Sequence, residues 1–200
     1  MKIFGKIISV GGVLCVVAVA AYLQWGYLLP RSFIIPFSSY NVIARGRATE
    51  QMMFDYVRAY NEKITSQRLR YIVKTYIWEC EYEGVNHDIA FVQMCHETNF
   101  LRFGGEIDSE QNNFGGLGTM DYDIYWACFF SIRRGVRAHV QHLKAYGSKL
   151  PLKNECVDSR FGIVQRGSAR SARALTGKWY ADGNYGDVLL SKVSALLKMK

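Results

Sequence analysis

Apolar residues recur at intervals of three and four along several parts of this chain, which is the spacing of an amphipathic helix. The pattern predicts helices over residues 50–61, 66–79, 132–146 and 185–197. Thr49 is suited to begin the first of them as an N-cap, and Gly84 is suited to stop the second.

One more predicted helix, Ile89–Phe100, differs because its apolar residues cover almost the whole circumference. A helix of that kind passes through the middle of a domain. Asn86 or Asp88 can cap its start, and Gly104 with Gly105 can end the segment.

Between residues 106 and 130 the helical period is lost, and glycines, amides and aromatic residues dominate. This composition predicts loops and a short hairpin, in a kind of segment that often carries function. We therefore expect a mainly α protein of the α+β class, with a central helix and one short irregular or β lobe.

The N-terminus has the pattern of an export or membrane segment. Lys2 and Lys6 precede a charge-free apolar run, Ile7–Leu23, which continues more weakly to Leu29. This pattern fits a cleavable signal peptide, with Ala18-Val19-Ala20 as the cleavage site, or an uncleaved hydrophobic helix that spans the bilayer. We expect the anchor, because the apolar character extends past the cleavage site.

These patterns divide the chain into three parts. We expect a signal peptide or transmembrane anchor over residues 1–29, a connector with two prolines over residues 30–48, and one globular domain over residues 49–200. Either form of the N-terminus places the domain outside the cytoplasm.

The net charge of the chain limits the kinds of partner that we expect. The chain has 25 Lys and Arg against 17 Asp and Glu, a formal net charge of +8, which favours anionic surroundings such as nucleic acid, acidic glycopolymers or phospholipid headgroups. An exported protein seldom meets nucleic acid, and no nucleic-acid motif accompanies the basic residues. We therefore expect no nucleic-acid partner.

Four cysteines follow the N-terminal segment: Cys80, Cys95, Cys128 and Cys156. The expected compartment permits disulfides, and four cysteines allow three pairings, but free thiols fit equally well. No CxxC pair occurs, so zinc binding by cysteine and thioredoxin-like chemistry have little support.

The histidines also give little support to a metal site. His96-Glu97 begins an HExxH motif, but Phe100 stands where the second histidine is required. His139 and His142 share one helix face without a third ligand nearby, so we interpret them as packing residues. We expect no metal and no cofactor.

Glu97 is a carboxylate on a helix otherwise suited to burial. Burial raises the pKa of a carboxyl group, and a position near a helix C-terminus raises it further. A carboxyl that stays protonated near neutral pH is what glycosidic cleavage needs as a general acid. The alternative is a structural ion pair with Arg102 or Arg137.

Seven segments carry a family resemblance. In chain order they are DIAFVQMCHETNF (88–100), RFGG (102–105), QNNFGGLG (111–118), RGVRAHVQHLKAY (134–146), CVDSRF (156–161), GKWYA (177–181) and YG (185–186). In this order and spacing they resemble the glucosaminidase domain of glycoside hydrolase family 73, which cleaves peptidoglycan. The resemblance covers residues 49–197.

The resemblance implies a lysozyme-like fold, with Glu97 as the catalytic acid at the end of the central helix beside a sugar-binding cleft. It also implies that Asn112, Asn113, Phe114 and Gly116 bind substrate along the cleft wall, although Phe114 could equally be a core residue.

Members of the family often carry a second catalytic carboxylate on a hairpin of the irregular lobe. This sequence departs from that pattern, because its irregular lobe is short. Asp123 and Asp121 are the nearest matches by position, ahead of Glu106 and Glu110. Either an aspartate activates water, or the substrate's own acetamido group attacks. In the second route the group is oriented by the Asn112 and Asn113 amides and by Tyr185, which matches a cleft tyrosine of the family. The short lobe favours the second route.

We therefore predict a cell-envelope peptidoglycan hydrolase, membrane-anchored or secreted, that cleaves the β-1,4 bond after N-acetylglucosamine. Its expected partners are glycan strands and, through the N-terminal segment, the membrane. The alternatives are a muramidase or lytic transglycosylase on the same fold, and a non-catalytic wall-binding module of an envelope apparatus.

Overall fold

Five α-helices build the part of the chain that the computed structural model describes, residues 40–118, 126–181 and 183–199. They are α2 (Glu50–Arg58), α3 (Ser66–Glu83), α4 (His87–Glu97), α5 (Ile132–Gly147) and α6 (Tyr185–Leu196), with 3-10 turns η2 (Ser109–Gln111) and η3 (Arg173–Leu175). The β pairing among the described residues consists of isolated bridges, one of which joins Gly118 to Trp126. The predicted mainly α class is confirmed.

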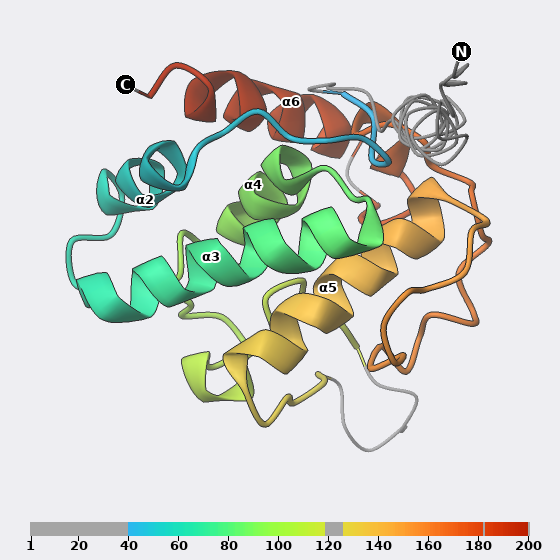
Figure 1. Ribbon diagram of the computed structural model, residues 1–200, viewed down its shortest axis with the longest axis horizontal. Helices are drawn as coiled ribbons and strands as arrows, with labels where there is room; N and C mark the ends of the chain where they lie inside the picture. The colour runs from blue at the N-terminus through green and yellow to red at the C-terminus, as the bar shows by residue number, and fades with distance from the viewer. Residues whose placement is uncertain (1–39, 119–125, 182, 200) are drawn as a thin grey trace, which may run out of the picture. The chain divides into compact units, whose positions relative to one another are not determined.

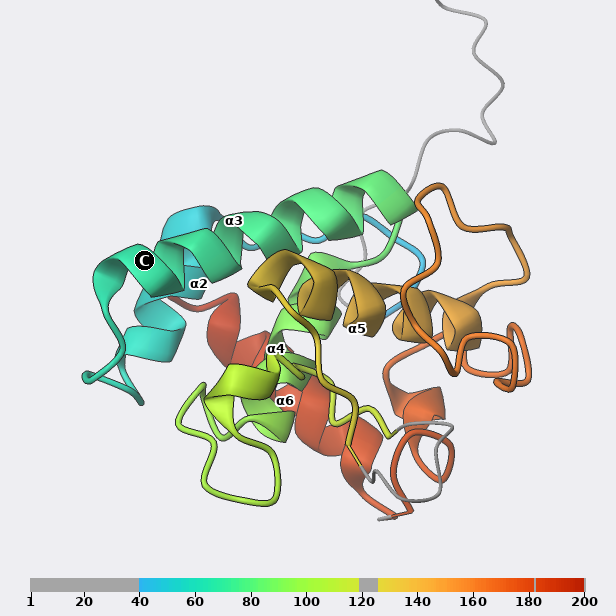
Figure 2. The same cartoon turned by 90° about the horizontal axis from the view of Figure 1, so that it is seen from below.

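Helix α4 is the central element of these described residues. It packs against α3 on one side and α6 on another, while α3 packs along α5 (Figures 1 and 2). Every residue from His87 to Cys95 is buried, which agrees with the apolar circumference in the sequence.

Thr49 and Asn86 are confirmed as N-caps, and α4 begins at His87, two residues before its predicted start. The Thr49 hydroxyl accepts a hydrogen bond from the Met52 amide at 3.2 Å, and the Asn86 side chain accepts from the Asp88 amide at 3.0 Å. Helix α3 runs four residues past its predicted end and stops at Gly84, whose φ of 78° is left-handed.

Helix α4 ends at Glu97, so the predicted end at Phe100 is wrong. Asn99, Phe100 and Leu101 have φ values of 49°, 57° and 61°, a region that non-glycine residues rarely adopt. The Thr98 hydroxyl holds this turn, because it donates to the Met94 carbonyl at 2.7 Å and accepts from the Leu101 amide at 2.9 Å. Glu97 therefore stands on the last turn of the central helix.

Two buried carboxylates on α3 fix α5 beside it. Glu79 pairs with Arg133 at 3.0 Å and with Arg137 at 3.1 Å, and Glu83 pairs with Lys144 at 2.7 Å. Both carboxylate side chains are fully buried, where an unpaired charge would be costly. The register of α5 along α3 is thus set by charge as well as by packing.

The predicted anchor over residues 1–29 lies outside the described residues, as does the connector up to residue 39. Within the described ranges, no helix is long and apolar enough to cross a membrane. The four cysteines after the N-terminal segment are free thiols, Cys80 and Cys95 in the core and Cys128 and Cys156 at the surface.

Candidate active site

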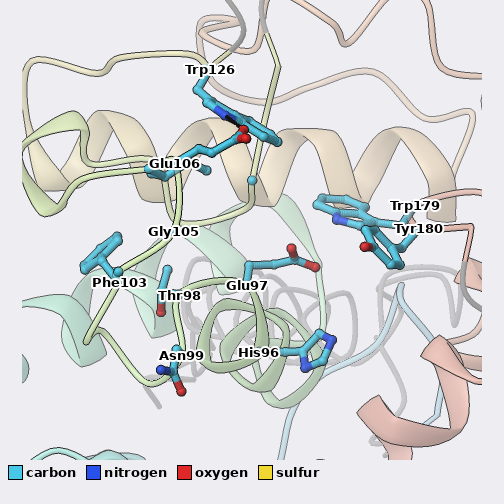
Figure 3. A pocket seen from close by; sticks show the side chains of 13 residues that line it. His96, Glu97, Thr98, Asn99, Phe103, Gly105, Glu106, Trp126, Trp179 and Tyr180 are labelled. Atoms are coloured by element: carbon cyan, nitrogen blue, oxygen red, sulfur yellow. Dashed lines mark hydrogen bonds between the residues drawn. The ribbon is translucent and has the colours of Figure 1, made fainter.

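A cavity of about 520 Å³ opens beside the end of α4, and we call it the Glu97 cavity. It is lined by His96, Glu97, Thr98, Asn99, Phe103, Gly104, Gly105, Glu106, Ile107, Gly116, Trp126, Trp179 and Tyr180. Figure 3 shows Glu97 directed into this space, with Glu106 and Trp126 on one side of it and Trp179 and Tyr180 on another.

The Glu97 carboxyl accepts hydrogen bonds from Tyr185 and Trp179 and lies against Gly116. The Tyr185 hydroxyl donates to Oε1 at 2.5 Å. Oε2 lies beside Gly116, where an added Cβ would come within 3.1 Å of it. Burial raises the pKa of Glu97, and hydrogen bonds from Tyr185 and Trp179 oppose the rise. A carboxyl whose pKa is raised and that faces a cavity is suited to donate a proton.

The two arginines considered as ion-pair partners of Glu97 have other partners in the described part of the chain. Arg137 binds Glu79 on α3, and Arg102 donates to the Asn99 side chain at 2.7 Å. An ion pair with either therefore does not account for Glu97.

Tyr185 contacts Glu97 but is not among the residues that line the Glu97 cavity. The tyrosine is only 2% exposed, and its oxygen also accepts a hydrogen bond from Gln93 Nε2 at 2.9 Å. The hydroxyl is thus engaged with Gln93 and Glu97, and its action on a substrate acetamido group stays a prediction.

Of the four residues predicted to bind substrate, Gly116 lines the Glu97 cavity. Asn113 is buried, and its amide donates to two backbone carbonyls across the loop at 2.8 and 3.1 Å. Asn112 donates to the Phe129 carbonyl at 2.9 Å, and Phe114 is fully buried. These three residues support the wall from behind.

The favoured second carboxylates, Asp121 and Asp123, belong to residues 119–125, which lie outside the described residues. Glu106 lines the Glu97 cavity, and its Oε2 accepts from Trp126 Nε1 at 2.8 Å. Glu110 is exposed elsewhere. Among the described residues, Glu106 is therefore the carboxylate that shares the cavity with Glu97.

The sequence did not single out Trp126 or Tyr180 as cavity residues, and it ranked Glu106 low. Trp126 follows the irregular segment, and Tyr180 is 59% exposed although it is aromatic. Aromatic residues in loops rich in glycine were the available signal, since such rings suit contact with the apolar faces of sugars.

A second cavity of about 320 Å³ shares Gly116, Trp126 and Trp179 with the Glu97 cavity, and we call it the extension. Arg160 and Lys178 line this extension, and its described lining holds no acidic residue. The charge of the lining therefore changes from acidic to basic along the groove.

His139 and His142 are engaged within the fold. His139 contacts Tyr76 and Gln93, and His142 Nδ1 lies 2.8 Å from Asp158 Oδ2. In the ranges that the structure covers, no group of three or more His, Cys, Asp or Glu side chains could hold a metal ion.

Comparisons with known proteins give two matches. The family model described as "Glucosaminidase: Mannosyl-glycoprotein endo-beta-N-acetylglucosaminidase" matches residues 73–196. A protein of Borreliella burgdorferi described as "Uncharacterized protein" is 41% identical over 159 residues, which cover 80% of this chain and 76% of that protein. No solved structure matches this chain.

Proposed function

Since this chain belongs to the glucosaminidase family, whose members are glycoside hydrolases, we propose that it hydrolyses peptidoglycan at the β-1,4 bond after N-acetylglucosamine. The proposal rests on the position of the Glu97 carboxyl. This carboxyl faces a cavity, and burial raises its pKa. In this proposal, residues 49–200 are the catalytic domain, with a lysozyme-like arrangement of a central helix and a flanking irregular lobe.

Glu97 acts as the general acid. Its proton passes to the glycosidic oxygen as the bond between that oxygen and the anomeric carbon breaks, so the leaving sugar departs as an alcohol. The remaining ring develops positive charge, which the ionised Glu97 and the carboxylate of Glu106 stabilise electrostatically.

Glu106 is the group that we propose to complete the reaction, because it shares the cavity with Glu97. As a general base it takes a proton from a water molecule, whose oxygen then bonds to the anomeric carbon. The acetamido route that the sequence favoured and a route through Asp123 are alternatives that substitution distinguishes.

The shape and lining of the groove support a polymeric substrate. The Glu97 cavity and the extension share Gly116, Trp126 and Trp179 in their walls. Rings at Trp126, Trp179 and Tyr180 offer apolar faces to sugars, and peptidoglycan supplies the anionic groups that suit Arg160 and Lys178 in the extension.

We further propose that residues 1–29 anchor the protein in the membrane and that residues 30–48 connect this anchor to the domain. This arrangement places the domain in the extracytoplasmic envelope, where its substrate is.

The test is hydrolysis of purified cell wall by the full-length protein and by Glu97→Gln. We expect the substitution to reduce product release about a hundredfold or more, because it removes the proton donor. Glu81→Gln, which changes an exposed carboxyl of α3, is the matched control and should retain wild-type activity. A Glu97→Gln variant with wild-type activity would refute the assignment.

Mass spectrometry of the released muropeptides identifies which glycosidic bond the protein cleaves. Reducing N-acetylglucosamine ends support the proposal. Reducing N-acetylmuramic acid ends would show a muramidase, and anhydro-muramic ends a lytic transglycosylase. Wall binding by the folded protein without any product would instead show a binding module.

A further inference from the structure

A chain of four hydrogen bonds runs from Glu97 into the interior. Tyr185 donates to Glu97 Oε1 at 2.5 Å, and Gln93 Nε2 donates to the Tyr185 oxygen at 2.9 Å. Gln93 Oε1 lies 3.0 Å from His139 Nε2, and His139 Nδ1 lies 2.8 Å from the Tyr76 hydroxyl. We call these side chains the Glu97 relay.

The Glu97 relay is buried and joins four helices. Tyr76 belongs to α3, Gln93 to α4, His139 to α5 and Tyr185 to α6. Tyr76, Gln93 and His139 are fully buried, and Tyr185 is 2% exposed. Buried polar groups of this kind must satisfy one another, because breaking one bond leaves another group without a partner.

The chemistry of the groups determines the direction of every bond. Tyr185 has one hydroxyl proton and donates it to Glu97, so it must accept from Gln93, whose NH₂ group therefore faces it. The Gln93 carbonyl then faces His139 Nε2, which must carry a hydrogen. His139 Nδ1 is left as an acceptor, and Tyr76 donates to it.

His139 keeps this direction because it stays neutral. Burial, with a smaller contribution from His142, lowers the pKa of His139 to about 3. One ring nitrogen therefore carries a hydrogen and the other does not over the whole neutral range. Each of the four hydrogen bonds of the Glu97 relay is thus donated in the direction of Glu97.

We propose that the Glu97 relay, through Tyr76, His139, Gln93 and Tyr185, holds Glu97 Oε1 as a permanent acceptor and so confines the catalytic proton to Oε2. Oε2 is the oxygen beside Gly116, which lines the cavity. The relay therefore directs the proton to the substrate side, and Gln93, His139 and Tyr76 are positioning residues.

The inference rests on the proposed role of Glu97 as the acid, but it has a consequence that needs no substrate. Four donors aligned toward a carboxyl favour its ionised form, so they oppose the rise in pKa that burial causes. Breaking the relay should raise the pKa of Glu97 further. His96, Glu106 and Tyr180 are the other titratable groups that line the cavity around it within the described residues.

The test is a carbon-13 NMR titration of the full-length protein in detergent, labelled at the glutamate side-chain carboxyl. The signal of Glu97 is identified by its absence in Glu97→Gln. We expect the pKa of Glu97 to rise most in Tyr185→Phe, less in Gln93→Met and least in Tyr76→Phe. The reason is that the effect of a donor on Glu97 falls with the number of hydrogen bonds between them.

Gln141→Met is the matched control. Gln141 is a fully buried amide on α5 that donates to the Glu155 carbonyl and accepts from the Val157 and Asp158 amides, and it makes no hydrogen bond to the Glu97 relay. Gln141→Met removes three side-chain hydrogen bonds, against two in Gln93→Met, and should leave the pKa of Glu97 at its wild-type value. If Gln93→Met fails to fold, Tyr76→Phe still tests the end of the relay that lies farthest from Glu97. This substitution removes only the hydroxyl and keeps the buried aromatic ring. Equal pKa values of Glu97 in Gln93→Met, Tyr76→Phe and Gln141→Met would overturn the proposal.

Activity gives a second readout. We expect Gln93→Met to lower wall hydrolysis at its optimum about tenfold through misplacement of the proton, and to move the alkaline limit of activity to higher pH. Gln141→Met should stay within about twofold of wild type. A wild-type protein that releases no product would refute the proposed function, while the titration would still decide the relay.

Discussion

Glu97 is under opposing influences at the residue scale. Burial favours its neutral form, whereas hydrogen bonds from Tyr185 and Trp179 favour the ionised form, and burial dominates. A carboxyl whose pKa is higher in the folded state than in the unfolded state disfavours folding once the pH exceeds the unfolded value. The buried position of Glu97 therefore costs stability at neutral pH.

We expect Glu97→Gln to stabilise the protein more at pH 7 than at pH 4. The penalty for ionising Glu97 grows as the pH rises from the unfolded pKa through the raised folded pKa, and glutamine does not ionise. The measurement is the free energy of unfolding in urea at both pH values. A stability difference between variant and wild type that is the same at pH 4 and pH 7, or larger at pH 4, would contradict the pKa shift.

The second catalytic group is also decided at the residue scale. If Glu106 is the base, Glu106→Gln should lose about a hundredfold or more in wall hydrolysis, while Asp123→Asn and Asp121→Asn stay within about tenfold of wild type. Glutamine can still accept from Trp126 Nε1, so this contact of the cavity wall is kept. Circular dichroism verifies the fold of each variant.

Two other outcomes of that comparison have clear meanings. Near wild-type activity in all three variants would favour attack by the acetamido group, and Tyr185→Phe should then reduce activity more than any of them. A folded but inactive Asp123→Asn or Asp121→Asn, beside an active Glu106→Gln, would assign the base to that aspartate.

At the scale of elements, α5 determines where the cavity wall lies. Gly135 faces the loop that leads to Gly116, and a Cβ at this position would lie 1.8 Å from the Asn112 carbonyl oxygen. A glycine inside a helix costs stability, but here it lets backbone approach backbone. The close approach brings the loop onto the helix that Glu79 and Glu83 hold against α3.

We expect Gly135→Ala to destabilise the protein by about 1–3 kcal/mol, as overpacking typically does, and to lower hydrolysis by displacing the wall. Gly162→Ala is the control, since a Cβ there meets nothing within 4 Å. Urea unfolding and wall hydrolysis measure the two effects. Equal stability of the two variants would show that the loop moves aside without cost.

At the scale of the whole molecule, the net charge and the apolar N-terminus both favour a location in the cell envelope. The formal net charge of +8 attracts the protein to anionic surfaces. Attraction of this kind weakens with salt, whereas burial of a long apolar segment in a bilayer does not. The two modes of retention can therefore be separated.

We expect the protein, expressed with its native N-terminus, to stay in the membrane fraction through a wash in 1 M salt. A variant without residues 2–29 tests whether the apolar run is responsible, and it should be released. Mass analysis that finds a mature N-terminus at Ala21 would show a cleaved signal peptide instead of an anchor and would leave export in place.

Local sequence determined the helices and the most conspicuous member of the site. Periodicity and caps at Thr49, Asn86 and Gly84 depend on neighbours within a few residues, so they could be recognised without a structure. Glu97 was equally visible, because a carboxylate on an apolar helix conflicts with its surroundings.

Only the tertiary structure decided how the rest of the site comes together. The end of α4 at Glu97 depends on the Thr98 hydroxyl and on Asn61, which donates to the Phe100 carbonyl from 39 positions away. The bond between Gln93 and Tyr185 spans 92 positions. Contacts of this kind leave no periodic trace in the chain, because they exist only after helices distant in sequence have packed.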